Sequence, residues 1–191
     1  MRQASLPLPA ACTCNDAYVC DAMHRCAGNG ALTDAVACWD WCLSQQAAVV
    51  QNSWGGVTKL QAMDTAANAV TAAGALLVCS AGNDGEDADT VLHFPSNYAA
   101  TNRAVISVGA STQQGALWPQ SNTGAKGVTV AAPGVQMLGL GLGSLYTKLT
   151  GTSMAGSWLS SRRVAGLELF DLRHQVPQVH TPAVEVRDIT L

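Results

Sequence analysis

Residues 151–155 read Gly151-Thr152-Ser153-Met154-Ala155, and they place a serine where a glycine-rich stretch gives way to a predicted helix. A hydroxyl at a helix N-terminus lies among backbone N–H groups that have no intrahelical partners, at the positive end of the helix dipole. This position favours developing negative charge, so Ser153 is a candidate nucleophile. Serine and threonine are also common N-caps, and the pentapeptide alone is equally consistent with a residue that only starts the helix.

Several upstream segments precede this serine in a fixed order. They are Ser53-Trp54-Gly55-Gly56, Ser80-Ala81-Gly82-Asn83-Asp84-Gly85, Phe94-Pro95, Val105-Ile106-Ser107-Val108-Gly109-Ala110 and Ala131-Ala132-Pro133-Gly134. Together with residues 151–155 they resemble the C-terminal half of the subtilisin-like serine protease domain, the subtilase or peptidase S8 family. The resemblance covers residues 28–155, and the order of the segments makes a chance match implausible.

The resemblance implies a role for each matching residue. Ser153 corresponds to the nucleophile, and Asn83 to the asparagine whose side-chain amide binds the oxyanion. Ser53, Trp54, Gly55 and Gly56 correspond to the strand that pairs with an extended substrate backbone, with glycine leaving room for a substrate side chain. Taken alone, Asn83-Asp84-Gly85 is also typical of an ordinary turn. The expected partner is therefore a polypeptide substrate.

The remaining parts of a catalytic triad are missing from the sequence. Subtilisins order their triad Asp, His, Ser, and neither the D-[ST]-G nor the H-G-[TH] context of the first two residues occurs here. His24 is followed by Arg25-Cys26. After the serine, where family members continue with Pro-His, this chain reads Gly156-Ser157-Trp158. The sequence thus predicts a serine-type endopeptidase domain that is incomplete and inactive by itself. The alternatives are a non-catalytic peptide-binding pseudoprotease and a truncated inactive fragment. An α/β-hydrolase is disfavoured because Ala155 replaces the final glycine of G-x-S-x-G.

The pattern of helices and strands agrees with this fold. Helical spacing begins at Thr33 and recurs over residues 60–73, and short apolar runs over residues 47–53, 75–80, 105–108 and 128–132 are predicted strands. Their alternation predicts an α/β fold: a mostly parallel sheet with helices on both faces, the subtilisin-like three-layer arrangement, here incomplete. Cys38 and Cys42, one helical turn apart, are expected to be core thiols.

Three regions are predicted along the chain. Residues 1–27 are an irregular cysteine-containing lead-in, residues 28–170 a partial subtilisin-like peptidase domain, and residues 171–191 a tail without periodicity that is a candidate for disorder. In the lead-in, Cys12, Cys14, His24 and Cys26 lack the paired C-x₂-C spacing of a strong zinc site, so stray or disulfide-linked cysteines are favoured.

Composition limits the other classes of function. The 191 residues are 48% apolar, which is typical of one globular domain, and the net charge of −3 without a basic run argues against nucleic-acid binding. No stretch approaches the roughly 18 apolar residues of a membrane span, and prolines interrupt any signal-peptide core near the start. A soluble protein is expected, and the odd number of seven cysteines leaves its compartment open.

No cofactor and no metal are predicted. Members of the family often bind calcium, so the resemblance allows a structural calcium ion. However, Glu86, Asp87 and Asp89 do not form a recognisable calcium loop and are better explained as a solvated loop. The resemblance also implies that the Phe94-Pro95 peptide bond is cis, which would make this segment a rigid turn rather than a binding site.

Overall fold

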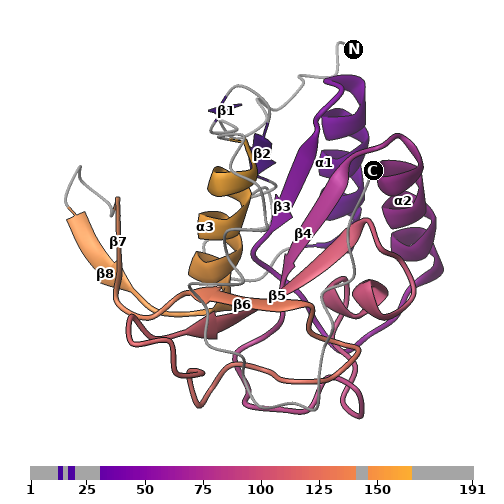
Figure 1. Ribbon diagram of the computed structural model, residues 1–191. Coiled ribbons are helices and arrows are strands. Elements are labelled where there is room, and N and C mark those ends of the chain that lie inside the picture. Colours follow the sequence, from indigo (N-terminus) through magenta and orange to yellow (C-terminus); the bar gives the residue numbers. More distant parts are fainter. Residues whose placement is uncertain (1–12, 15–16, 20–30, 141–145, 165–191) are drawn as a thin grey trace.

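The computed structural model describes residues 13–14, 17–19, 31–140 and 146–164 (Figure 1). The elements in chain order are β1 (Thr13–Cys14), β2 (Ala17–Val19), α1 (Leu32–Ser44), β3 (Val49–Asn52), α2 (Gln61–Ala72), β4 (Leu76–Ser80), the 3₁₀ helix η1 (Ser96–Ala100), β5 (Val105–Ser111), β6 (Val130–Pro133), β7 (Met137–Leu140), β8 (Tyr146–Leu149) and α3 (Thr152–Val164). The predicted tail over residues 171–191 lies outside the described residues.

Strands β2 to β6 form a parallel sheet in sequential order, and β1 pairs antiparallel with β2 at its edge. Crossover connections between parallel strands are right-handed. When successive strands are added at the same edge of the sheet, their connecting helices therefore lie on the same face. Helices α1 and α2 accordingly cover one face, while α3, which returns after the β7–β8 hairpin, covers the other (Figure 1). The predicted α/β three-layer arrangement is confirmed.

Strands β3, β4 and β5 are buried on both faces, and alternate side chains enter two separate cores. Val50 and Leu77 pack with Trp39 of α1 and Val70 of α2, whereas the neighbouring side chain of Val78 packs against α3. Every residue of β5 is buried, and the strand contributes Val105 to the first core and Ile106, Val108 and Ala110 to the second. A sheet covered on both faces requires the continuous apolar runs seen in the sequence rather than an alternating pattern.

The predicted irregular lead-in differs from the structure at two places. Residues 13–14 and 17–19 form the short strands β1 and β2, and β2 pairs in parallel with Val49, Val50 and Gln51 of β3. A strand of three residues is too short to show a period in the sequence, and its pairing depends on the neighbouring strand. Cys12, His24 and Cys26 of the disfavoured zinc site lie outside the described residues.

The two cysteines of α1 have different roles. Cys42 is buried and free, and burial raises the pKa of its thiol to about 11. Cys38, one turn earlier, is disulfide-bonded. The prediction of a core thiol is confirmed for Cys42 and wrong for Cys38, which is partly buried and whose sulfur is bonded to another cysteine.

The acidic loop after β4 is anchored rather than simply solvated. The carboxylate of Asp89 accepts hydrogen bonds from the backbone N–H groups of Ala125, Lys126 and Gly127, at donor–acceptor distances of 2.7 to 3.2 Å. Within the described residues no group of three or more His, Cys, Asp or Glu side chains could hold a metal ion.

Replacing Asp89 by asparagine should destabilise the fold in a pH-dependent way. Burial acts to raise the pKa of this carboxyl, but the three N–H donors outweigh it and the net shift is downward. A lowered pKa in the folded state contributes stability at neutral pH that is lost as the pH falls through it. We expect Asp89→Asn to lower the free energy of unfolding by about 1–2 kcal/mol at pH 7, and less in acid.

Urea unfolding at several pH values would measure this difference, with Glu86→Gln on the same exposed loop as the matched control. An equal loss of stability at neutral and strongly acidic pH would contradict the anchoring role of the carboxylate.

Candidate active site

The candidate nucleophile lies where α3 begins, directly against the end of β3. The Ser153 hydroxyl donates to the backbone oxygen of Ser53 at 3.4 Å, and the Ser53 hydroxyl donates to the backbone oxygen of Ser153 at 3.2 Å. The buried side chain of Gln51 donates in turn to Ser53 Oγ. These contacts join residues 100 positions apart and fix Ser153 at the carboxyl end of the parallel sheet.

Asn83 reaches the same place from the loop after β4, and Thr152 holds it there. The backbone N–H and the hydroxyl of Thr152 both donate to Asn83 Oδ1 at 2.9 Å. The Thr152 hydroxyl also accepts a hydrogen bond from the N–H of Gly82 at 3.3 Å. Because Oδ1 accepts both of these bonds, the Asn83 NH₂ group is directed away from Thr152. The structure brings Ser153 and Asn83 together, as the sequence predicts.

Two hydrogen-bond donors near Ser153 are therefore available to a ligand. One is Asn83 Nδ2, on an exposed side chain, and the other is the backbone N–H of Ser153 itself. In the described part of the chain neither donor has an acceptor. The first N–H groups of a helix lack intrahelical partners and carry partial positive charge. The arrangement can stabilise negative charge on an oxygen placed next to Ser153 Oγ.

Asn122, which the sequence analysis missed, shapes the loop that carries Asn83. Its buried side chain accepts hydrogen bonds from the N–H groups of Asp84 and Glu86 at 3.1 and 3.0 Å, and donates to the carbonyl oxygen of Ala81 at 3.0 Å. Gly82, at φ +110°, packs so closely on this amide that a side chain there would overlap it. A single asparagine in a polar loop gives no sequence signal for this role, because its partners are backbone groups about 40 residues away.

The predicted substrate-binding segment contains two kinds of residue. The ring of Trp54 packs against Trp39, with 5.6 Å between the ring centroids, so its side chain belongs to the core. Gly55 and Gly56 are exposed, and Gly56 pairs with Phe94 through two backbone hydrogen bonds of 2.9 and 2.7 Å. Among the described residues, neither the N–H nor the C=O of Gly55 has a hydrogen-bond partner. Gly55 thus offers backbone groups to a ligand.

His93 is the only histidine among the described residues, and it does not act on Ser153. Its Nδ1 lies 3.1 Å from Ser96 Oγ, and no hydrogen bond joins its ring to Ser153. Burial lowers the pKa of the imidazole, and the charge of Asp84 only partly opposes this effect. The following Phe94-Pro95 bond is cis, as the resemblance implies. In the part of the chain that the structure describes, Ser153 Oγ has no basic partner.

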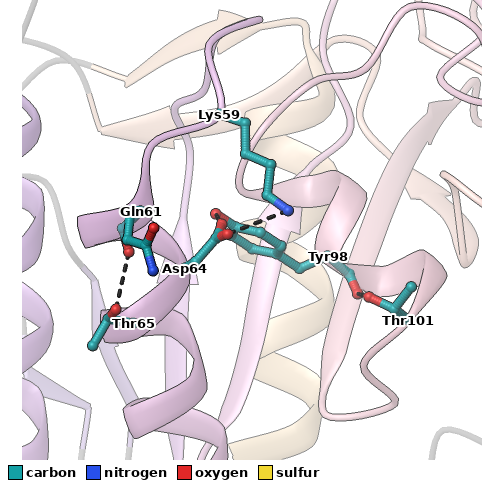
Figure 2. A network of polar contacts seen from close by, with 6 residues as sticks. All are labelled: Lys59, Gln61, Asp64, Thr65, Tyr98 and Thr101. Atoms are coloured by element: carbon teal, nitrogen blue, oxygen red, sulfur yellow. Dashed lines mark hydrogen bonds and ion pairs between the residues drawn. The ribbon is translucent and has the colours of Figure 1, made fainter.

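A polar network joins the 3₁₀ helix η1, which follows His93, to helix α2 (Figure 2). Tyr98 of η1 donates its hydroxyl hydrogen bond to Asp64 of α2, and Lys59 forms an ion pair with the same carboxylate at 3.2 Å. The bond from Tyr98, together with Lys59, holds the pKa of Asp64 below its usual range. The ring of Phe94 packs on Tyr98, with 5.2 Å between the centroids. The network therefore connects the turn after Gly56 to the segment that carries His93.

The three-layer α/β fold, with a serine at a helix N-terminus and an asparagine amide beside it, agrees with the subtilisin-like domain that the sequence motifs resemble. The chain belongs to the subtilase family, whose family model matches residues 17–166. This match begins ahead of the predicted domain start at residue 28, because it includes strand β2.

Similarities to individual proteases support this assignment. Subtilisin BL from Lederbergia lenta is 31% identical over 67% of this chain and 45% of its own length, and the thermostable alkaline protease of Halalkalibacterium halodurans is 29% identical over 73% and 36%. The crystal structure of a cold-adapted subtilisin-like serine proteinase superposes with a TM-score of 0.64 at 27% identity, covering 74% of this chain and 50% of that one. The chain thus spans about half the length, or less, of these relatives. No helix among the described residues is long and apolar enough to cross a membrane.

Removing the Thr152 hydroxyl should loosen the site. Thr152 is fully buried, and Thr152→Val keeps its shape but leaves the Gly82 N–H without its acceptor and Asn83 with one donor fewer. We expect the free energy of unfolding to fall by about 1–3 kcal/mol. Thr152→Ser retains the hydroxyl and should lose less. Chemical denaturation of the three proteins measures the effect, and a valine variant at least as stable as the serine variant would contradict it.

Proposed function

We propose that this chain supplies the nucleophile, the oxyanion donors and the peptide-binding edge of a serine-type endopeptidase site, and that its 191 residues cleave peptide bonds little or not at all by themselves. The observation that supports this proposal most strongly is the double hydrogen bond from Thr152 to Asn83 Oδ1, which directs the Asn83 NH₂ group away from Thr152 beside Ser153. The relatives are named as proteases, which supports a polypeptide as the substrate.

The proposed chemistry is acyl transfer through Ser153. Its Oγ attacks the carbonyl carbon of a peptide bond, and the carbonyl π electrons move to the oxygen, which the Ser153 N–H and Asn83 Nδ2 stabilise as an oxyanion. The Oγ proton must pass to a general base. In the structure this hydroxyl donates instead to the carbonyl oxygen of Ser53, which is not a base. Without a base the serine is a weak nucleophile, and this is the reason for the low activity proposed.

Peptide binding requires less than catalysis does. An extended peptide beside residues 53–55 can pair with the free backbone groups of Gly55, as in β-augmentation. This is the basis of the second candidate, a peptide-binding pseudoprotease. The proposed step itself uses only protein groups and needs no cofactor.

Labelling with a fluorophosphonate probe tests the catalytic part of the proposal. In a subtilisin, loss of the base costs about 10⁶-fold in turnover, a value measured on that enzyme. We therefore expect labelling of Ser153 to be at least about 10³-fold slower than in a complete subtilase. Ser153→Ala should abolish it, and Ser161→Ala, an exposed serine of the same helix, should not change it. Labelling of Ser153 at the rate of a complete protease would show that a base is present, with His24 the first residue to replace.

Fluorescence anisotropy with an extended alanine peptide tests the binding part. Gly55→Pro removes the free N–H and fixes φ, and we expect it to weaken binding by about tenfold. Ser153→Ala should bind as the wild type does, because the pairing uses backbone groups. If the folded wild type binds no peptide, or if Gly55→Pro binds equally well, the peptide-binding edge is assigned wrongly.

A further inference from the structure

The space beside Gly55, which the resemblance reserves for a substrate side chain, is occupied by His93. A methyl group on Gly55 would overlap Cε1 of the imidazole and lie 2.7 Å from Nε2 and 2.8 Å from Nδ1. A methyl group on Gly82, across from it, would lie 3.5 Å from Cδ2 of the same ring. The ring therefore lies between the two glycines. It fills the room beside Gly55 and reaches contact distance of Gly82, where Asn122 is the nearer group.

Hydrogen bonds hold the ring in this position. The hydroxyl of Ser96 donates its one proton to the carbonyl oxygen of His93 at 2.7 Å, so Nδ1 is the donor in its 3.1 Å contact with Ser96 Oγ. The backbone N–H of His93 donates to Asn97 Oδ1 at 2.6 Å. Both partners belong to η1 and are buried, so neither the ring nor its backbone is free to swing aside without breaking buried hydrogen bonds.

The ring also lies where the reacting residue of a bound peptide must place its side chain. Gly82 directly precedes Asn83, and Gly55 belongs to the peptide-binding edge next to Ser53 and Ser153. A substrate carbonyl carbon at Ser153 Oγ is bonded to a Cα about 1.5 Å away. The side chain on that Cα begins beside these two glycines and meets the imidazole.

We propose that His93 sets the size of the substrate side chain at this position, admitting glycine, alanine and serine and excluding leucine and phenylalanine. This inference rests on the proposed peptide-binding function of the same site. It concerns a residue that neither takes part in the acyl transfer nor pairs with the peptide backbone. His93 is thus a specificity-determining residue and not a catalytic one.

Product-like peptides with a free C-terminal carboxylate test the proposal in a defined register. The carboxylate of acetyl-Ala-Ala-Ala-X pairs with the two free donors at Ser153 and Asn83, which places X at His93. We expect wild-type protein to bind X = Ala about tenfold more tightly than X = Phe. In His93→Gly and His93→Ala the phenylalanine peptide should gain about tenfold in affinity, while the alanine peptide changes little.

The outcomes separate the two proposals. Equal preference for alanine over phenylalanine in the wild type and both variants would overturn the role of His93 and leave the binding function intact. No binding of any peptide by any of the folded proteins would overturn the proposed function, and this inference with it. If neither variant unfolds cooperatively, NMR of the wild type decides: binding of the X = Ala peptide must shift the His93 Cε1–H resonance, and an unshifted resonance contradicts the proposal.

Discussion

One oxygen, Asn83 Oδ1, accepts two hydrogen bonds, and these bonds determine the geometry of the whole site. Thr152 supplies both donors, from its backbone and from its hydroxyl, and the same hydroxyl accepts from Gly82. The loop after β4 and the first turn of α3 are thereby joined through one fully buried residue. If this contact is lost, the orientation of the Asn83 amide is no longer defined, and the donor next to Ser153 is lost with it.

The parallel sheet makes this contact possible. Strands β3 and β4 are neighbours with their carboxyl ends at the same edge, so Ser53 and Asn83, which follow them, are brought close together. Helix α3 packs on the opposite face from α1 and α2, with Ala155 and Leu159 in the second core (Figure 1). Its N-terminus is directed to that edge. A functional site beyond the carboxyl ends of parallel strands is the general rule for open α/β sheets.

The site is held firmly although the described residues supply no base. Buried polar side chains that a peptide would not contact, Asn122 and Gln51, hold its loops and the end of β3. The network of Lys59, Asp64 and Tyr98 joins α2 to η1, which directly follows the segment with His93 (Figure 2). Preorganised donors need such support, because an oxyanion is stabilised only by dipoles already directed at it. Under the proposed function, peptide binding and oxyanion stabilisation would therefore be separable from proton transfer in this chain.

The sequence alone determined the family, the layered α/β fold, the cis bond before Pro95 and the proximity of Ser153 and Asn83. The α/β fold follows from local patterns, namely apolar runs for doubly buried strands and helical spacing. The family, the cis bond and the proximity of the two residues follow from the resemblance to subtilases that the short motifs carry. Tertiary structure decided what depends on contacts between distant segments. Strand β2 is too short to show a period, and Cys38 differs from Cys42 through its bonding partner. Asn122 and Thr152 form hydrogen bonds with groups far along the chain. The position of His93 between Gly55 and Gly82 is of the same kind. A glycine in the sequence shows only that no side chain stands at that position, and the fold decides which other group fills the space.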